Sequence, residues 1–242
     1  MKKIGMFVLC VFLIACQKEP VTPATPTPEQ GCDVFEECGD EGVATTNSFV
    51  QEYEILNGTT NSSGKEHRTI HIPEDHPFEK ISQEVLLEKL TNKETFYLYV
   101  GDSMCPWCRS VLETAISKAK EYMVDKIYYI EIWDEEGNEI FRDKFIEDCE
   151  KAIREVEPTE AYLKLLEVCD PLLQEYFISG GETECLYETG EKRIYAPSFF
   201  YIENGIGVKM TTGIPSDQED PRADLTDAQA QEQKEQFDEF FK

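Results

Sequence analysis

Basic side chains are scarce in this sequence, and histidine is scarcer still. The chain has 242 residues, with 23 lysines and arginines against 49 aspartates and glutamates, and its formal net charge is −26. A surface of that sign repels nucleic-acid phosphates and anionic lipid headgroups, which argues against nucleic-acid binding and against electrostatic docking on a membrane. Only three histidines are present, and none follows residue 76. Most of the chain therefore lacks the commonest metal ligand.

A hydrophobic run long enough to cross a bilayer as a helix is also missing. The apolar stretch at residues 4–15 has twelve residues, whereas a transmembrane helix needs about 20. This stretch follows Lys2 and Lys3, and a short basic segment before a short apolar one is typical of a signal peptide. We therefore expect residues 1–15 to be a signal peptide.

The end of this segment, "LIAC" at residues 13–16, resembles the lipobox of bacterial lipoproteins. The resemblance implies cleavage before Cys16 and a diacylglyceryl group on its sulfur. It also implies a lipid anchor on the extracytoplasmic face of the cell membrane, in a Gram-positive bacterium. Two acyl chains suffice for stable anchoring, since each buried methylene contributes about 0.8 kcal/mol. The alternative is an ordinary cleaved signal followed by a cysteine without lipid.

Nine cysteines are present, and outside the cytoplasm disulfides can persist. Cys10 leaves with the signal peptide and Cys16 is acylated in this interpretation. The odd number that remains leaves at least one thiol free or paired between molecules. A local disulfide is favoured between Cys32 and Cys38. The pairing stays open for Cys149, Cys169 and Cys185.

Composition divides the rest of the chain into three parts. Residues 16–47 hold the lipidated cysteine and a Pro/Thr-rich tether that we expect to be largely disordered. Residues 48–80 are interpreted as an extension of irregular structure and short strands. Residues 81–242 are expected to form one domain. An acidic insertion at about 134–191 interrupts it and is predicted to be mainly helical, with a helix over 160–177 that breaks at its proline.

Within that domain, hydrophobic periodicity predicts alternating helices and strands. The expected elements are a helix at 81–90, a strand at 95–100, a helix after Cys105, a strand at 126–132, a hairpin of strands at 199–204 and 207–213, and a last helix from Thr226. The hairpin is joined by Asn-Gly, a strong turn signal. The last helix begins with a capping box, in which Thr226 is the cap and Gln229 reaches back.

The motif "CPWC" lies where a predicted strand leads into a helix. A helix N-terminus presents unpaired N–H groups and about half a positive charge, which stabilises a thiolate and lowers its pKa. We therefore expect Cys105 to be an exposed nucleophile and Cys108, one turn deeper, to resolve the mixed disulfide. Pro106 suits the first turn of the helix, and Trp107 offers an apolar surface beside the sulfur.

A second motif, "YAPSF", places Pro197 directly before the next predicted strand. Together the two motifs resemble the thioredoxin superfamily, in particular thioredoxin-like lipoproteins similar to bacteriocin-transport accessory proteins. The resemblance implies an α/β, thioredoxin-like three-layer fold in which helices flank a central mixed sheet. It also implies a cis bond between Ala196 and Pro197, opposite Cys105 and Cys108, with Ala196 offering backbone atoms to the substrate. The dithiol carries the electrons, so no cofactor and no metal are expected.

Two departures from the thioredoxin pattern leave the direction of electron flow open. Thioredoxins carry a buried aspartate six residues before the first cysteine, and Tyr99 occupies that position here, so this proton acceptor is missing. Asp102 is nearer in sequence, and whether its side chain faces solvent is open. The Pro106–Trp107 dipeptide differs both from the Gly-Pro of reducing thioredoxins and from the Pro-His of strong oxidants.

Other interpretations of these residues are weaker. A zinc site at Cys105 and Cys108 needs two more ligands nearby, which the spacing of the other cysteines and histidines does not supply. A purely structural disulfide there would close a very short loop and would stabilise little. Surface positions rather than metal binding are expected for His67, His71 and His76, because "RTIHI" predicts a strand.

The sequence thus predicts a membrane-anchored, extracytoplasmic thiol–disulfide oxidoreductase. Its expected substrates are the disulfides of exported proteins or peptides, and an unidentified redox partner is expected to recycle it. Two alternatives stay open. One is a non-catalytic thioredoxin-fold binding module with the acidic insertion as its partner surface. The other is an accessory protein for bacteriocin secretion or immunity.

Overall fold

The computed structural model describes residues 46–134, 136–148, 151–179 and 186–242. All of them belong to one unit, Gly42–Lys242. Among these residues, no helix is both long enough and apolar enough to cross a membrane. The predicted signal peptide and residues 16–45 of the predicted tether lie outside the described residues, whereas residues 46 and 47, also assigned to the tether, are helical. Also outside the described residues are Cys16, Cys32, Cys38, Cys149 and Cys185.

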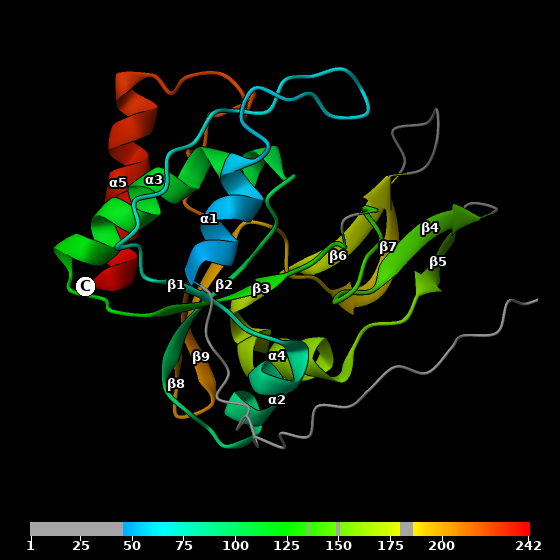
Figure 1. Cartoon of the computed structure of the whole chain (residues 1–242). Helices are drawn as coiled ribbons and strands as arrows, with labels where there is room; N and C mark the ends of the chain where they lie inside the picture. Colours follow the sequence, from blue (N-terminus) through cyan, green and yellow to red (C-terminus); the bar gives the residue numbers. More distant parts are fainter. Residues whose placement is uncertain (1–45, 135, 149–150, 180–185) are drawn as a thin grey trace, which may run out of the picture. The chain divides into compact units, whose positions relative to one another are not determined.

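A five-stranded mixed sheet forms the centre of this unit, with the strand order β1-β3-β2-β8-β9 (Figure 1). Three strands run parallel to one another, namely β1 (Phe78–Lys80), β3 (Ile127–Glu131) and β2 (Phe96–Gly101). Next to β2, the hairpin of β8 (Ser198–Glu203) and β9 (Ile206–Thr211) continues the sheet in antiparallel pairing. The predicted strands and the hairpin are therefore confirmed, within one or two residues at their ends.

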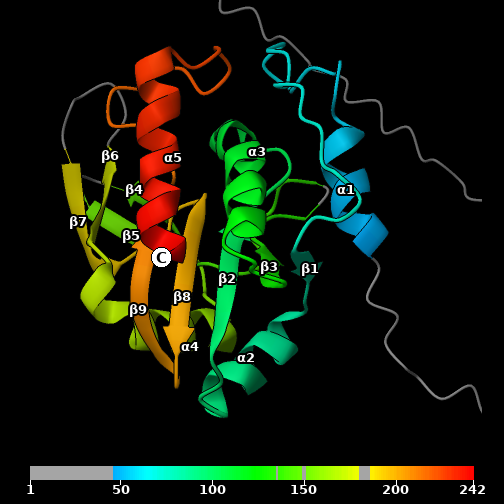
Figure 2. The same ribbon diagram turned by 90° about the vertical axis from the view of Figure 1, so that its left-hand side faces the viewer.

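Helices cover both faces of the sheet. One face carries α1 (Thr46–Glu54), α3 (Pro106–Glu121) and α5 (Asp227–Phe241), and the other carries α2 (Gln83–Thr91) and α4 (Glu160–Cys169) (Figure 2). The expected α/β class is confirmed, as is its arrangement as a central mixed sheet between helical layers.

The central strands are apolar throughout because they are buried on both faces. Successive side chains of a strand point to opposite sides. Tyr99 and Phe199 therefore pack among the residues of α1, α3 and α5, while Leu98 and Phe200 pack among those of α2 and α4. All four are 0% exposed.

Local turn and cap chemistry sets several element ends. Asn204 and Gly205 have φ of 53° and 75°, as a two-residue hairpin turn requires. At Gly205 a Cβ would also lie 2.9 Å from Lys93 Cα. The positive φ and this close contact both favour glycine at position 205. At the start of α5 both hydrogen bonds of the predicted capping box are present, between Thr226 and Gln229.

The expectation of a mainly helical insertion at about 134–191 is wrong. Among its described residues, two hairpins flank the helix α4 and the short 3-10 turn η1 (Asp170–Leu172). They are β4 (Lys144–Asp148) with β5 (Lys151–Val156), and β6 (Glu175–Ser179) with β7 (Leu186–Lys192). These strands are short, charged and largely exposed, and their five to seven residues carry too little hydrophobic periodicity to predict a strand. Their stability comes instead from cross-strand pairs, such as Ile146 opposite Ile153.

The interpretation of residues 48–80 as irregular structure and short strands is also incomplete. Residues 46–54 form helix α1, and only Phe49 and Tyr53 among its described side chains are buried. Two buried residues four apart are a weak helical signal in a sequence. The helix is held by packing, because Phe49 stacks on Phe78 of β1 with ring centroids 4.7 Å apart.

Candidate active site

Cys105 is the N-cap residue of α3, and Pro106 is the first residue of that helix. The chain leaves β2 at Gly101, and four residues later it turns into the helix with Cys105 in extended conformation. The hydrogen bond from the Cys108 thiol is the largest cause that lowers the pKa of Cys105. The backbone N–H groups of Cys108 and Trp107 lower that pKa further, against the opposing effect of burial. The helix N-terminus thus holds Cys105 as the more acidic thiol of the pair.

Cys108 has the opposite character. It is 0% exposed, and burial raises its pKa well above the ordinary value, with the hydrogen bond to Cys105 adding to the effect. When the reduced pair loses its first proton, that proton therefore leaves Cys105, and Cys108 keeps its own. A reactive thiolate beside a protonated, shielded thiol is the arrangement that stepwise disulfide exchange uses.

The expectation that Cys105 is exposed is wrong, since only 6% of it is accessible. Trp107 and Ala196, both half-buried, pack against the core cluster that contains this cysteine. Ala196 lies 91 residues away in the chain. The local sequence pattern places a cysteine at the start of a helix. It does not show which distant segment covers that cysteine.

The distant segment is the turn at Ala196 and Pro197, whose peptide bond is cis, as predicted. The turn directly precedes β8, which pairs with β2 so that Ser198 lies opposite Val100. This register carries the turn to the end of β2 from which the chain leads to Cys105. The Cys105 sulfur lies 3.7 Å from the Ala196 carbonyl oxygen. The structure thus brings together the two motifs that the sequence singled out.

A buried ion network holds the chain that leads into this turn, and sequence analysis missed it. Arg193 donates to the backbone and the side-chain oxygen of Asp143, each at 2.8 Å. Arg142 donates to the Ile194 carbonyl at 3.2 Å and pairs with Glu139. Because Arg193 and Ile194 lie three and two residues before Ala196, the insertion anchors the Ala196–Pro197 segment.

Two tyrosines lie beneath Cys108. The Tyr99 hydroxyl hydrogen-bonds the Cys108 thiol and also meets the Tyr53 hydroxyl at 2.9 Å. Burial raises the pKa of both tyrosines well above the ordinary value. Gly101 makes room for this arrangement, because a Cβ at that position would overlap the Tyr99 ring. The position where thioredoxins carry an aspartate therefore holds a neutral phenol here.

Asp102 does not face solvent. It is 1% exposed, one carboxylate oxygen accepts from the Met104 N–H at 2.8 Å, and the other oxygen, Oδ2, has no hydrogen bond of ordinary geometry. Burial raises the pKa of Asp102 to about 7, and the Glu131 carboxylate adds to the shift. The Asp102 backbone N–H also donates to the Cys108 sulfur. A titratable carboxyl group thus adjoins the dithiol.

Arg109, directly after the motif, is also buried at 1% exposure. Its guanidinium donates to the carbonyls of Arg68 at 2.7 Å, Tyr53 at 2.8 Å and Ser103 at 3.2 Å, and to the Asn57 side-chain oxygen at 2.7 Å. These acceptors are all neutral, and burial lowers the pKa of the guanidinium. The side chain ties α1 and the loop before Cys105 to the first turn of α3.

The sequence did carry a signal for Arg109. This residue lies on the same helical stripe as Leu112 and Ile116, which are buried. A charged residue within an apolar stripe indicates a buried, hydrogen-bonded group.

No second catalytic centre emerges among the described residues. No group of three or more His, Cys, Asp or Glu side chains in this part of the chain could hold a metal ion. Two of the histidines expected at the surface, His67 and His76, are buried, whereas His71 is exposed. Cys169 is a buried thiol whose pKa is raised by burial to about 12, which makes it unreactive.

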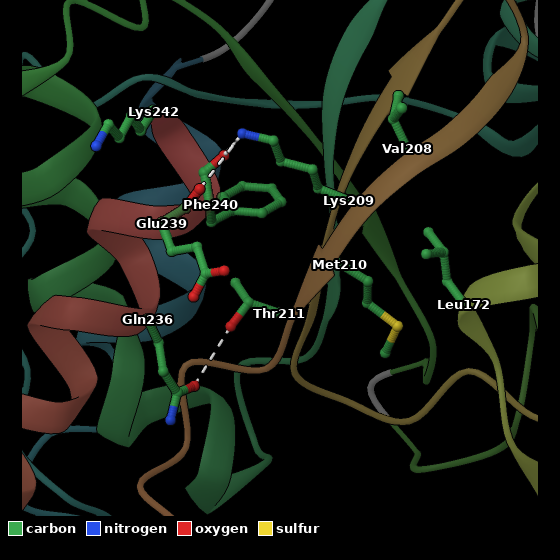
Figure 3. Close-up of a pocket in the computed structure, with 9 residues that line it drawn as sticks. All are labelled: Leu172, Val208, Lys209, Met210, Thr211, Gln236, Glu239, Phe240 and Lys242. Carbon is green, nitrogen blue, oxygen red and sulfur yellow. Dashed lines mark hydrogen bonds between the residues drawn. The ribbon is translucent and has the colours of Figure 1, made fainter.

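A cavity of about 570 Å³ lies away from both motifs (Figure 3). It lies between the edge strand β9 and the C-terminal end of α5. There the Lys209 ammonium donates to the Glu239 and Phe240 carbonyls, each at 3.3 Å. Its apolar wall includes Val208 and Met210. None of its lining residues belongs to the CPWC loop or to the Ala196–Pro197 turn.

Compared with protein-family models, with curated proteins and with solved structures, the chain gives no match. The site is therefore interpreted from its own residues.

Proposed function

We propose that the chain is a thiol–disulfide oxidoreductase with a thioredoxin-like fold, acting on disulfides of exported proteins or peptides. The observation that carries the proposal is the asymmetry of the pair. Cys105 has a lowered pKa at the start of α3, Cys108 has a raised pKa, and the Ala196 carbonyl lies 3.7 Å from the Cys105 sulfur. Two unrelated core cysteines have no reason to differ in this way.

In the reducing direction, the Cys105 thiolate attacks one sulfur of the substrate disulfide. The substrate S–S bond breaks, the other sulfur leaves as a thiolate that takes a proton from water, and a mixed disulfide forms. Cys108 then loses its proton and attacks the Cys105 sulfur, which releases the second substrate thiolate. Two electrons pass from the dithiol to the substrate, and a thiol-bearing redox partner restores the protein. The oxidising direction is the same sequence in reverse.

The surroundings assign roles to the neighbouring residues. Pro106 starts the helix whose N–H groups stabilise the thiolate, and Trp107 provides an apolar surface beside it. The backbone of Ala196 and Pro197 flanks the sulfur and would align an extended substrate segment. The Tyr99 hydroxyl hydrogen-bonds Cys108, and the Asp102 backbone N–H donates to the Cys108 sulfur, so both hold this thiol in position beneath Cys105.

One observation favours a second candidate, a binding module without catalysis. With 6% of Cys105 accessible, a substrate disulfide reaches the sulfur only along a narrow approach. A thioredoxin-like groove can hold a peptide without exchanging its disulfide. A bacteriocin secretion or immunity accessory would use the same site with a particular exported peptide.

Trapping separates the two candidates. Cys108→Ser leaves the nucleophile and removes the resolving thiol, so mixed disulfides with exported proteins should accumulate, whereas Cys105→Ser should form none. Wild-type protein should also reduce insulin disulfides with dithiothreitol as electron donor. Wild-type activity in the Cys105→Ser variant would refute the mechanism, and an absence of adducts in Cys108→Ser would favour the binding module.

Anchoring at the membrane is a separate part of the proposal. It rests on the apolar run at residues 4–15 and the "LIAC" that ends in Cys16. Cys16→Ala should release the protein from the membrane fraction into the medium. Retention of that variant at the membrane would contradict lipid attachment at this residue.

A further inference from the structure

A second pocket, of about 450 Å³, borders the loop that carries the CPWC motif. Its walls come from α1, from β1, from the residues after β2 and from the end of β3. Ser103 and Met104 both line it, and Met104 is the residue directly before Cys105. The hydrogen bond from Arg109 to the Tyr53 carbonyl holds α1 in place as one of these walls. The lining of the pocket therefore extends to the residue before the nucleophile in the chain.

The apolar part of this pocket is open to solvent. Ile55, just after α1, is 75% exposed, and Leu56 and Met104 are half-buried. An isolated exposed isoleucine is ordinary on a protein surface. Here it joins two further apolar side chains in one concave wall, and covering such a wall with an apolar side chain is favourable.

The polar part of the pocket is acidic. Lys80 lies between Glu52 and Glu131, 2.7 Å from each, so one cation faces two carboxylates. Asp134 adds another negative charge, because hydrogen bonds from Asn138 lower its pKa. The lining thus has an excess of two negative charges, and a concave acidic surface concentrates cations.

We propose that this pocket binds a basic and apolar segment of the disulfide-bearing substrate, next to its reacting cysteine. An aliphatic side chain packs on Ile55, Leu56 and Met104, and an adjacent lysine or arginine faces Glu131 and Asp134. The proposal rests on the thiol–disulfide exchange proposed above and specifies its substrate. Charge complementarity selects this occupant over the chain's own N-terminal segment, since residues 17–45 carry seven acidic side chains and one basic one.

Three synthetic peptides test the proposal. Each contains the same disulfide to a small chromophoric thiol, and its cysteine is flanked by Leu-Lys, Leu-Glu or Ser-Lys. Stopped-flow absorbance of the released chromophoric thiol measures the second-order rate constant with the pre-reduced full chain at low and high salt. We expect the Leu-Lys peptide to react about tenfold faster than Leu-Glu at low salt, with the ratio falling as salt screens the charges. It should react about fivefold faster than Ser-Lys.

Matched variants locate the effect. Asp134→Asn should reduce the preference for Lys over Glu, and Ile55→Ser should reduce the preference for Leu over Ser. The control is Ile206→Ser, because Ile206 is 62% exposed and lies at the β8–β9 turn, at the opposite end of β8 from Ser198. The control should keep both preferences. Equal rates for all three peptides, or equal effects of Ile55→Ser and Ile206→Ser, would overturn the proposal.

The design separates this proposal from the function on which it rests. If the reduced protein reacts with a small neutral disulfide but shows no peptide preference, the pocket proposal fails and the oxidoreductase stands. If it reacts with no disulfide, the oxidoreductase fails. Peptide binding is then measured by fluorescence anisotropy on Cys105→Ser with S-methylated peptides. Tighter binding of Leu-Lys supports the pocket, and equal binding refutes it.

Discussion

Replacing Asp102 by asparagine should stabilise the protein above neutral pH. Asparagine has nearly the same shape, keeps an oxygen for the Met104 N–H, and places a neutral amide where Oδ2 now lies buried without an ordinary hydrogen bond. It removes a carboxyl group whose ionised form is disfavoured by burial.

The size of the effect follows from proton linkage. The pKa of Asp102 is raised from 3.8 to about 7 in the folded chain. Below both values the folded and unfolded chains are both protonated there, so the group costs nothing. Between them the unfolded chain releases its proton and the folded chain keeps it, so stability falls as pH rises. Each pKa unit corresponds to about 1.4 kcal/mol. Above pH ~7 the raised pKa of Asp102 therefore lowers the free energy of unfolding by about 4 kcal/mol.

Loss of the charge-assisted hydrogen bond to Met104 reduces the gain from the substitution to about 2 to 3 kcal/mol at pH 8. Urea unfolding of the reduced protein at several pH values measures it, and the midpoint should rise by about 1 M at pH 8. At pH 4 the variant should be no more stable than wild type.

The comparison variant is Asp134→Asn, which should lose stability at neutral pH, because hydrogen bonds from Asn138 lower the pKa of Asp134.

The Asp102→Asn substitution should also lower the pKa of Cys105. The Cys108 hydrogen bond is the main cause that lowers this pKa, and the Asp102 carboxylate opposes it. Iodoacetamide should therefore alkylate Cys105 faster in Asp102→Asn near neutral pH. If wild type and Asp102→Asn have parallel stability curves from pH 4 to 8, the assignment of a buried, raised-pKa carboxyl group to Asp102 is wrong.

Three further substitutions test what holds the site together, each by urea unfolding. Arg109→Met removes the donor of several buried carbonyls, including that of Tyr53, and should lower the free energy of unfolding by about 3 kcal/mol. An unchanged urea midpoint would contradict the role of this side chain. Gly101→Ala forces the Tyr99 ring to move and should cost about 1 to 3 kcal/mol, with a changed near-ultraviolet circular dichroism spectrum; a native spectrum would count against the close approach. Thr226→Ala should cost about 1 kcal/mol through the lost cap of α5, and a loss below a few tenths would show that the cap matters little.

Elements defined by local chemistry could be predicted from the sequence. The run "TFYLYV" corresponds to the buried strand β2, and the Asn204–Gly205 turn joins β8 and β9 as expected. The helix from Thr226 begins at its capping box. In each case a few adjacent residues carry the physical cause.

Elements held by distant contacts could not be predicted in this way. The hairpins of the insertion bury few side chains, and β4 pairs with β5 mostly through charged residues, so hydrophobic alternation is too weak to identify them. Helix α1 is stable because Phe49 and Tyr53 meet β1 and the tyrosines of the sheet. Such contacts depend on strand order, which a short window of sequence does not contain.

Local sequence is enough to predict that a strand leads into a helix at Pro106, that Cys105 is the N-cap residue, and that a proline precedes a later strand. How Cys105 is covered, where the Asp102 carboxyl group lies and which carbonyls accept from Arg109 follow from the packing of distant segments. The Ala196 carbonyl lies 91 residues from Cys105, and three of the four acceptors of Arg109 lie 41 to 56 residues from it along the chain. Burial and pKa are set by everything that packs around a group, whereas a helix start is set by the few residues that form it.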